Sequence, residues 1–231
     1  MTDIFHQDSY CQDCETVITA VDARGVQTTD TVFYAAGGGQ PGDTGTLTSA
    51  GREWIVTDTV RDTDGIWHQL ADDSPQPAVG DTATLQIDWA RRHRIMRLHS
   101  ALHMLCATVP APVTGGSIQS DRARLDFDLP EPIDKDTVNA NLQAVIAQNA
   151  PMQTRWITDA ELDAQPELVR TLSVQPPRGS GQVRLVEFVG VDLQPCGGTH
   201  VANTGEIGPV RVQKIEKKGR QNRRITVVLE D

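Results

Sequence analysis

The sequence predicts an α+β fold in which a small antiparallel β-barrel is followed by an α+β domain. The first 90 residues contain short strand-like runs separated by turn signals. From Arg91 onward the apolar residues recur at helical spacing instead, and further strand-like runs surround a second helical segment. The change of period predicts two domains, residues 1–90 and residues 91–231.

The predicted barrel strands are short and are separated by turn sequences such as Arg24-Gly25 and Asp64-Gly65. Strands of this length, with turn residues at this spacing, are typical of small antiparallel barrels. The expected strands are Thr16–Ala20, Val26–Tyr34, Trp54–Val60, Ile66–Leu70 and Thr82–Trp89.

The second domain is expected to begin with a helix that starts near Arg91 and ends before Pro110, because apolar residues from Ile95 to Val109 follow helical spacing. A second helix is expected over Lys135–Gln148, with Asp134 as its N-cap. The expected strands of this domain are Arg124–Leu129, Gln153–Thr158, Val183–Val189, Val210–Glu216 and Arg224–Leu229.

Composition places the chain among ordinary globular proteins. Of its 231 residues, 38% are hydrophobic and 23% are charged, values that allow a substantial core. No apolar run is long enough to cross a bilayer, and the first residues are too acidic for a signal peptide. We therefore predict a cytoplasmic protein without a membrane partner, in which the 4 cysteines stay reduced.

The charge is unevenly distributed. The whole chain has a formal charge of −10, but residues 211–231 carry seven Lys/Arg against three Asp/Glu, a local balance of +4 that leaves −14 for the remainder. Such a basic segment is either a solvated face or a track for phosphates. A second basic cluster follows Trp89 and consists of Arg91, Arg92, Arg94 and Arg97.

A metal site is predicted from two distant segments. His99 and His103 are four residues apart, so a helix places both imidazoles on one face. Cys196 and His200 lie on a loop that Gly197 and Gly198 free to turn closely. Three imidazoles and one thiolate suit zinc, so we predict one Zn²⁺ per chain.

Other interpretations of these cysteines and histidines stay open. The two helical histidines alone could be buried, hydrogen-bonded residues, and no Glu follows His99 as in the metalloprotease motif. Cys106 lies near the same helical face and could replace Cys196 as the sulfur ligand, although its apolar neighbours favour a packing role. The pair Cys11 and Cys14 has no partner pair, and we interpret it as incidental.

A glycine-rich stretch, FYAAGGGQPGDTG, occupies residues 33–45. Gly37, Gly38 and Gly39 could let the backbone approach a ligand closely, with N–H groups facing anionic or carbonyl oxygens. The stretch lacks the Lys-Ser/Thr and the following helix of a P-loop. A tight barrel hairpin would explain the glycines but not Gln40, which is well placed to orient a substrate or a water.

Five stretches carry a family resemblance: FYAAGGGQPGDTG, HSALHML, GGSIQSDRARLDFDL, CGGTHVANTGEIG and IEKKGRQNRRI occur in this order. Together they resemble the editing domain of alanyl-tRNA synthetases and the free-standing alanyl-tRNA editing proteins, the AlaX family. The resemblance runs from about residue 15 to 231. It implies a hydrolase that removes serine, and often glycine, from tRNA for alanine, built as a translation-factor-like barrel joined to a zinc-containing editing domain.

The resemblance also implies roles for individual residues. His99, His103, Cys196 and His200 match the family's zinc-binding positions, and Gln40 matches a glutamine implicated in editing. The chain has Ala35-Ala36-Gly37 where free-standing members often carry a proline and a hydroxyl residue before the glycines, a difference that bears on whether serine or glycine is the preferred substrate. ATP-site motifs are absent, so no ATP is expected. Phosphate contacts are expected from Lys214, Lys217, Lys218, Arg220, Arg223 and Arg224.

Zinc held by four protein ligands would favour a structural or positioning role, whereas a displaced ligand would allow Lewis-acid catalysis. Two rival functions stay open: a non-catalytic tRNA-binding module with a structural zinc, and a zinc hydrolase of small esters or peptides. The basic tail and the absence of a carboxylate beside the histidines disfavour the second rival.

Overall fold

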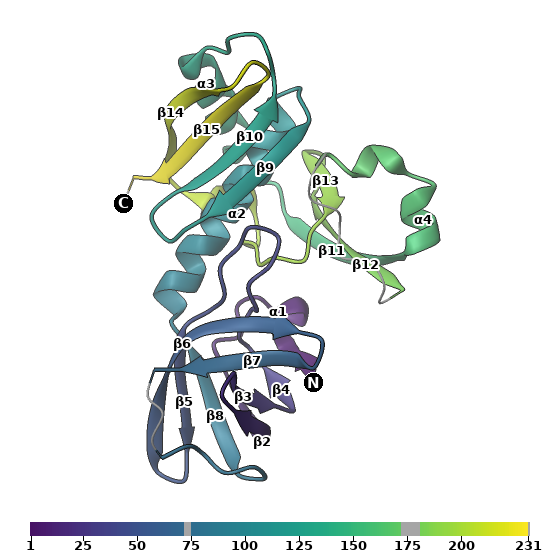
Figure 1. Cartoon of the computed structure of the whole chain (residues 1–231). Coiled ribbons are helices and arrows are strands. Elements are labelled where there is room, and N and C mark those ends of the chain that lie inside the picture. Colours follow the sequence, from purple (N-terminus) through teal and green to yellow (C-terminus); the bar gives the residue numbers. More distant parts are fainter. Residues whose placement is uncertain (72–74, 172–180, 231) are drawn as a thin grey trace. The chain divides into compact units, whose positions relative to one another are not determined.

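The computed structural model describes residues 1–71, 75–171 and 181–230 (Figure 1). The chain divides into two compact units, Met1–His93 and Arg94–Asp231. The first is a closed antiparallel barrel and the second mixes helices and sheets, so the predicted α+β architecture is confirmed. The division between the units falls inside helix α2, Trp89–Thr108, close to the change of period in the sequence.

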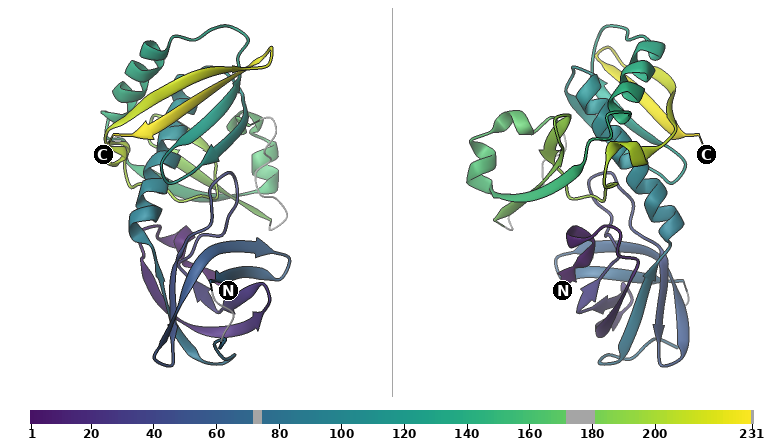
Figure 2. Two further views of the ribbon diagram at one scale, coloured as in Figure 1. Left: turned by 60° about the vertical axis from the view of Figure 1, so that its left-hand side comes forward. Right: turned by 180° about the vertical axis from the view of Figure 1, so that it is seen from behind.

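The barrel closes through six strands, in the order β2-β3-β7-β6-β5-β8 (Figure 2). Their inward residues, which include Ile18, Leu47, Val56 and Leu85, are buried and alternate with outward residues, as expected for a pleated strand. The strands are Asp13–Asp22 (β2), Gly25–Thr28 (β3), Gly45–Ser49 (β5), Arg52–Asp62 (β6), Gly65–Leu70 (β7) and Thr82–Ile87 (β8).

One predicted barrel strand was wrong in extent. Val26–Tyr34 is not continuous, because β3 ends at Thr28 and the short β4, Asp30–Thr31, pairs with β1, Thr2–Asp3, outside the barrel. The break occurs because the Thr16 hydroxyl accepts a hydrogen bond from the Asp30 N–H and donates one to the Asp30 carbonyl. A four-residue helix α1, Ile4–Gln7, follows β1.

The predicted end of the last barrel strand was also wrong. Trp89 does not end β8 but begins α2, and the Asp88 carboxylate accepts a hydrogen bond from the Arg91 N–H at 3.1 Å. A side chain that satisfies a free N–H of the first turn is a common start signal for a helix. The prediction also omitted the barrel strand β5, which is short and begins with Gly45.

The second unit contains a four-stranded antiparallel sheet of order β14-β15-β10-β9. Helices α2 and α3 lie on the same face of this sheet in both the front and the rear views (Figures 1 and 2). The other face of the sheet carries polar side chains. The strands are Val113–Ile118 (β9), Ala123–Asp128 (β10), Val210–Lys218 (β14) and Asn222–Leu229 (β15).

Helix α3 spans Lys135–Ile146, two residues shorter than predicted at its C-terminus. The predicted N-cap is confirmed, because the Asp134 carboxylate accepts a hydrogen bond from the Thr137 N–H at 2.8 Å. The helix lies along β14, where the Asn139 side chain accepts a hydrogen bond from the Val212 N–H at 3.0 Å.

A second, three-stranded sheet has the order β11-β12-β13, with strands Met152–Thr158, Gln182–Phe188 and Asp192–Pro195. It packs a small core with helix α4, Asp159–Asp163, and with the 3-10 turn Pro166–Leu168. A further 3-10 turn spans Thr204–Ile207. Strand β13, which the sequence did not predict, ends directly before Cys196. Among the described residues, no helix is both long and apolar enough to cross a bilayer.

Candidate functional site

Helix α2 presents two histidines on one face. His99 and His103 have ring centroids 5.4 Å apart, and both side chains are buried. The helix is buried on most of its other positions as well, for example at Ile95, Leu98 and Leu105. The surrounding packing therefore limits where the two imidazoles can point.

The loop after β13 brings the other two predicted ligands to this helix. Strand β12 fixes the loop, because the Arg184 guanidinium donates hydrogen bonds to the carbonyls of Cys196 and Gly198 at 3.0 and 2.9 Å. Helix α2 fixes its far end through the Ser100 hydroxyl, which bonds the His200 Nδ1 at 3.1 Å and accepts from the Val201 N–H at 3.2 Å. Two segments nearly one hundred residues apart thus meet.

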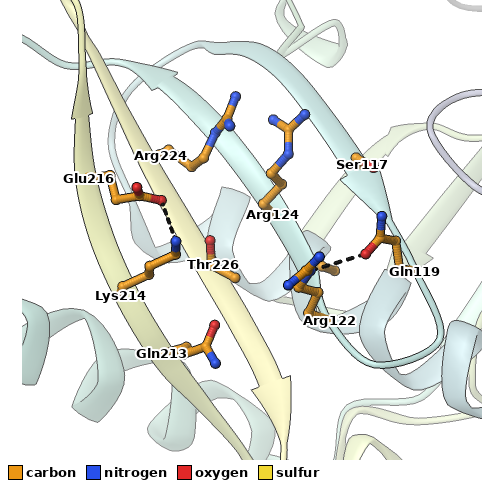
Figure 3. A pocket seen from close by; sticks show the side chains of 10 residues that line it. Ser117, Gln119, Arg122, Arg124, Gln213, Lys214, Glu216, Arg224 and Thr226 are labelled. Carbon is orange, nitrogen blue, oxygen red and sulfur yellow. Dashed lines mark hydrogen bonds and ion pairs between the residues drawn. The ribbon is translucent and has the colours of Figure 1, made fainter.

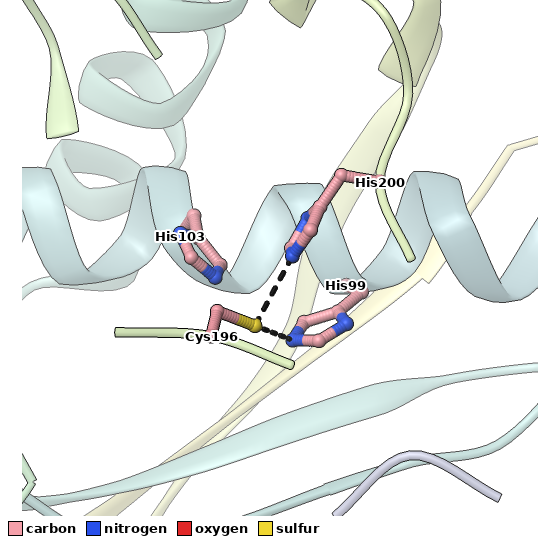
Figure 4. Close-up of side chains that lie close together, drawn as sticks. All are labelled: His99, His103, Cys196 and His200. Carbon is pink, nitrogen blue, oxygen red and sulfur yellow. Dashed lines mark hydrogen bonds between the residues drawn. The ribbon is translucent and has the colours of Figure 1, made fainter. Parts of the chain in front are cut away.

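The four predicted ligands form one group (Figure 4). One ligand atom from each of His99, His103, Cys196 and His200 lies within 4.8 Å of all the others. The Cys196 Sγ is 3.2 Å from the His200 Nε2 and 3.5 Å from the His99 Nε2. In a tetrahedral zinc site, ordinary Zn–S and Zn–N lengths separate sulfur from nitrogen by about 3.6 Å. The donor set and its spacing therefore fit a zinc ion.

A supporting shell orients two of the imidazoles. The His103 Nδ1–H donates to the Asp192 Oδ2 at 2.9 Å, and the Gln194 amide donates to the same oxygen at 2.8 Å. With Nδ1 occupied in this way, and the His200 Nδ1 occupied by Ser100, the Nε2 atoms of both rings remain for a metal. Arg170 lies beyond, with its Nε 3.8 Å from the Asp192 Oδ1.

The protonation of the group favours metal binding at two of its members. Burial opposes ionisation of the Cys196 thiol, but the charge of His99 and hydrogen bonds from the neighbouring rings hold its pKa well below the ordinary 9.0. Burial, and then the charge of His99, keep the pKa of His200 well below 6.5. Thiolate and neutral imidazole are the forms that bind zinc.

His103 behaves differently. Burial disfavours its charged form, but its hydrogen bonds to Asp192 and Cys196 outweigh this effect and raise its pKa to about 9. A metal that binds the His103 Nε2 at neutral pH must therefore displace a proton.

The other cysteines do not join the group. Cys106 is buried, and burial is the main reason why its pKa rises to about 12. Cys11 and Cys14 belong to the barrel unit, where both are free thiols, and burial raises the pKa of Cys14 to about 11. Within the described ranges the structure therefore assembles the donor group with Cys196 as its sulfur atom.

The glycine-rich stretch forms a tight two-residue turn in the barrel unit. The backbones of Gly37 and Gln40 bond each other in both directions, at 3.0 and 2.9 Å. Gly38 and Gly39 at the turn have φ values of +58° and +86°, which side-chain-bearing residues rarely adopt. The hairpin geometry thus accounts for these two glycines. Gln40, in contrast, is buried, with 2% of its surface exposed.

A buried ion pair closes the base of this loop. The Asp43 carboxylate accepts hydrogen bonds from the Tyr34 N–H at 2.6 Å and from the Arg92 guanidinium, and both Asp43 and Arg92 are buried. The Arg92 guanidinium also donates to the carbonyls of Val32 and Ser9 at 2.7 and 3.1 Å. Arg92 is therefore part of the barrel core, although the sequence grouped it with possible phosphate contacts.

Three other members of that basic cluster also contact the backbone. Arg91 donates to the Gly42 carbonyl at 2.8 Å. In the second unit, Arg94 donates to the Ser120 carbonyl at 3.1 Å and Arg97 to the Ile207 carbonyl at 2.8 Å. Each of these arginines has a structural contact that the charge pattern alone could not reveal.

The basic tail forms the β14–β15 hairpin. Lys214, Lys217 and Lys218 lie on β14, and Arg220 lies in the turn that follows. Arg224 on β15 pairs with the Asp126 carboxylate at 2.7 Å. Its neighbour Arg223 is buried and donates to the carbonyl of Pro130, so it has little surface to offer a phosphate.

Sequence reasoning missed the residues that support both regions. Ser100 lies between the two helical histidines, and Asp192 lies four residues before Cys196, so their nearness in sequence was a usable signal. Asp43 and Arg92 gave no such signal, because their pairing joins positions 49 residues apart.

Comparison with known proteins links both units to tRNA synthetases. Residues 6–91 match the family described as tRNA synthetases class II (A). Residues 183–226 match the threonyl and alanyl tRNA synthetase second additional domain, and this match includes Cys196 and His200.

Full-length relatives are more specific. The chain is 32% identical to the alanyl-tRNA editing protein AlaX-M of Methanosarcina acetivorans, with 100% of both chains covered. It is 34% identical to the AlaX-M protein of Methanosarcina barkeri, covering 99% of this chain and 98% of that protein. The alanine–tRNA ligase of Pyrobaculum calidifontis is 30% identical over 93% of this chain, but over only 25% of the ligase.

The resemblance seen in the sequence motifs therefore extends over the whole length of free-standing relatives, and only over one part of the ligase. The site agrees with it, because the CGGTH loop and the helical histidines form one donor group. This chain belongs to the family of alanyl-tRNA editing proteins.

Proposed function

We propose that this protein hydrolyses the ester bond between a wrongly attached serine and tRNA for alanine, acting in trans on the charged tRNA. The observation that carries the proposal is the convergence of His99, His103, Cys196 and His200 in a chain related over its full length to alanyl-tRNA editing proteins. A free-standing editor of this kind needs no ATP, because hydrolysis of an aminoacyl ester is favourable by itself.

We further propose that the four donors hold one zinc ion per chain. Three imidazoles and a thiolate form a donor set that binds zinc in preference to harder cations such as Mg²⁺ or Ca²⁺. The rings of His103 and His200 are already oriented by Asp192 and Ser100, which lowers the cost of assembling the site. A cytoplasmic location, where thiols stay reduced, would keep Cys196 available as a ligand.

When bound, zinc would supply a positive charge beside the substrate's amino acid or carbonyl group. The residues of the chain supply position and hydrogen bonds. A site with four protein donors is closed, which favours a structural or positioning role for the metal. An uncharged hydrogen-bonding group such as the amide of Gln40 is then suited to hold the ester or the attacking water.

Binding of the tRNA is assigned to surface cations of the second unit, with Lys214, Lys217, Lys218 and Arg220 as the exposed members of the original set. These residues lie on or beside one β-hairpin, which could follow the phosphate backbone. Gly37, Gly38 and Gly39 are proposed to shape the loop that presents Gln40, with their exposed backbone available to the substrate.

The test is incubation of the purified protein with serine-, glycine- and alanine-charged tRNA for alanine, with release of free amino acid as the readout. We expect rapid release of serine and no release of alanine, and the glycine reaction measures how far the Ala35-Ala36 variation changes the preference. Tight tRNA binding without release of any amino acid would instead support a non-catalytic module. Hydrolysis of small esters with indifference to tRNA would support a general zinc hydrolase.

A further inference from the structure

The solvent face of the four-stranded sheet contains a basic pocket that is separate from the metal centre (Figure 3). Its volume is about 250 Å³, and none of the four metal donors lines it. The cations that line it come from two hairpins distant in sequence: Arg122 and Arg124 from β9–β10, and Lys214 and Arg224 from β14–β15. The sequence had assigned only the second pair to phosphate contacts.

Strand register explains why these residues meet. Lys214 on β14 is opposite Thr226 on β15, Thr226 is opposite Arg124 on β10, and Arg124 is opposite Ser117 on β9. One row across four strands therefore places two cations and two hydroxyls on the same face. On β10, Leu125 follows Arg124, so its side chain points to the other face of the sheet, where it is buried.

The next row borders the pocket, which Glu216 and Arg224 line. Glu216, Arg224, Asp126 and Gly115 lie opposite one another in the same strand order. Gly115 contributes no side chain, so this end of the row stays open. Arg224 bonds Asp126 through two nitrogens, at 2.7 and 2.8 Å, which holds the guanidinium extended along the sheet.

The two acidic residues do not cancel the cations. Arg122, Arg124, Lys214 and Arg224 contribute four positive charges, and Asp126 and Glu216 contribute two negative charges, so these six residues sum to +2. Lys214 pairs with Glu216 at 3.0 Å and Arg124 with Asp126 at 3.1 Å, so each acid is shared and the surplus of cations remains. The chain as a whole carries −10. A local positive potential on an acidic protein attracts anions to that face and repels them elsewhere.

We propose that this pocket, which we call the sheet-face pocket, binds the phosphate backbone of the tRNA at a point away from the reacting end. The inference rests on the proposed function, and it names a surface that the tail residues alone did not define. Arginine forks, a lysine and two hydroxyls are the groups that most often contact phosphate oxygens. Because α2 lies on the opposite face of the sheet, a phosphate held here is not the one next to the reacting ester.

The test uses the intact protein and fluorescently labelled, uncharged tRNA for alanine, with the dissociation constant measured over a series of salt concentrations. In the pocket variant, Arg122→Gln, Arg124→Gln and Lys214→Gln are combined, and Arg224 is kept because it makes two hydrogen bonds to Asp126 across the sheet. Each lost phosphate contact removes about 0.9 from the slope of log affinity against log salt. We expect the slope to fall by about 2 to 3, and affinity at low salt to fall by roughly tenfold or more.

A matched control removes the same charge from the barrel, by combining Arg24→Gln, Arg52→Gln and Arg61→Gln. We expect this variant to retain most of the wild-type slope. An unchanged slope in the pocket variant, or an equal loss in the barrel control, would overturn the proposal. Zinc content and melting temperature of both variants show whether each one is folded, and an Arg124→Lys variant should keep the slope because it keeps the charge.

Release of serine from charged tRNA is measured separately on the wild-type protein. If the wild type releases no serine but the pocket variant loses tRNA affinity, the proposed function fails and the sheet-face pocket stands. If the wild type is active and the pocket variant binds normally, only the pocket proposal fails.

Discussion

The donor group of His99, His103, Cys196 and His200 and the glycine-rich loop are built in opposite ways. The loop is local: ten consecutive residues from Tyr34 to Asp43 turn back on themselves. A few distant side chains, Thr59, Arg91 and Arg92, bond its base. The donor group is non-local, since its members come from α2 and from a loop nearly one hundred residues later. A local motif can be recognised as a unit, whereas a non-local centre depends on every element that carries a donor.

The two regions also differ in what surrounds them. The four donor residues sit in a shell of hydrogen bonds with Ser100, Asp192 and Arg184, which hold the rings of His200 and His103 and the loop in place. The loop has one buried charged pair at its base and exposed glycines at its tip. We therefore expect substitutions in the donor group to lower the metal content, and substitutions in the loop to lower the stability or the rate of deacylation.

The largest effect is expected from removal of metal donors. Combining Cys196→Ala with His200→Ala leaves two imidazoles, too few for a stable zinc site, so zinc should fall from about one per chain to background. Metal analysis of the purified protein is the measurement. The control Cys106→Ala should keep its zinc, because that thiol lies outside the donor group; loss of zinc there would show that the sulfur ligand was misassigned.

The next largest effect is expected at the base of the glycine-rich loop. Arg92→Leu leaves the Asp43 carboxylate buried without its main partner, which typically costs about 3–5 kcal/mol in the free energy of unfolding. Urea unfolding followed by fluorescence measures this change. Arg61→Gln, which breaks one solvent-accessible ion pair with Asp3 on the same unit, should change stability little. Equal stabilities for the two variants would contradict the structural role of Arg92.

Gln40→Ala is expected to change the free energy of the reaction's transition state by less than Arg92→Leu changes the free energy of unfolding, but to cause a clear loss of rate. Loss of one oriented hydrogen-bonding group commonly lowers a rate by about 100-fold or more. Release of serine from charged tRNA should fall by this amount, while zinc content and tRNA affinity stay near wild type. A Gln40→Ala variant with wild-type deacylation would show that the loop is structural, and would leave the metal centre as the remaining candidate for catalysis.

Weakening the supporting shell should reduce metal affinity without abolishing it. Asp192→Asn replaces the carboxylate that accepts from the His103 Nδ1–H, and losses of this kind lower metal affinity by about 10–100-fold. Competition with a chromophoric chelator measures the affinity. The zinc-loaded fold should persist at high metal concentration, which separates this variant from the loss of a donor. If Asp192→Asn binds zinc with wild-type affinity, Asp192 does not support metal binding.

The smallest step, counted per single pH unit, is expected in the dependence of zinc affinity on pH. Cys196 and His200 have pKa values that are lowered, which favours the thiolate and the neutral imidazole that bind metal. The pKa of His103 is raised to about 9, so below that pH zinc must displace one proton. Affinity should therefore fall about tenfold for each pH unit below this value. A flat profile would indicate that His103 is neutral or is not a ligand.

Much of this protein follows from its sequence. The barrel, the two helices and most strands of the second unit were predictable, because periods of two and of 3.6 mark strands and helices directly. The donor group was also predictable, because the type and spacing of its residues can be taken directly from the sequence. The signals were the i, i+4 spacing of His99 and His103 and the loop from Cys196 to His200. Asp134 as a helix cap was equally readable, because capping is a local interaction.

Tertiary structure decided the remainder. The strand predicted over residues 26–34 breaks because Thr16, a residue of another strand, satisfies the backbone of Asp30. Arg92 and Arg223 look like surface cations in the sequence, yet both are buried by contacts with residues far along the chain. The sheet-face pocket exists because antiparallel register places Lys214 and Arg124 in one row. Which residues of two strands lie opposite one another depends on how the segments are arranged in the folded chain. Local sequence patterns therefore do not predict this register.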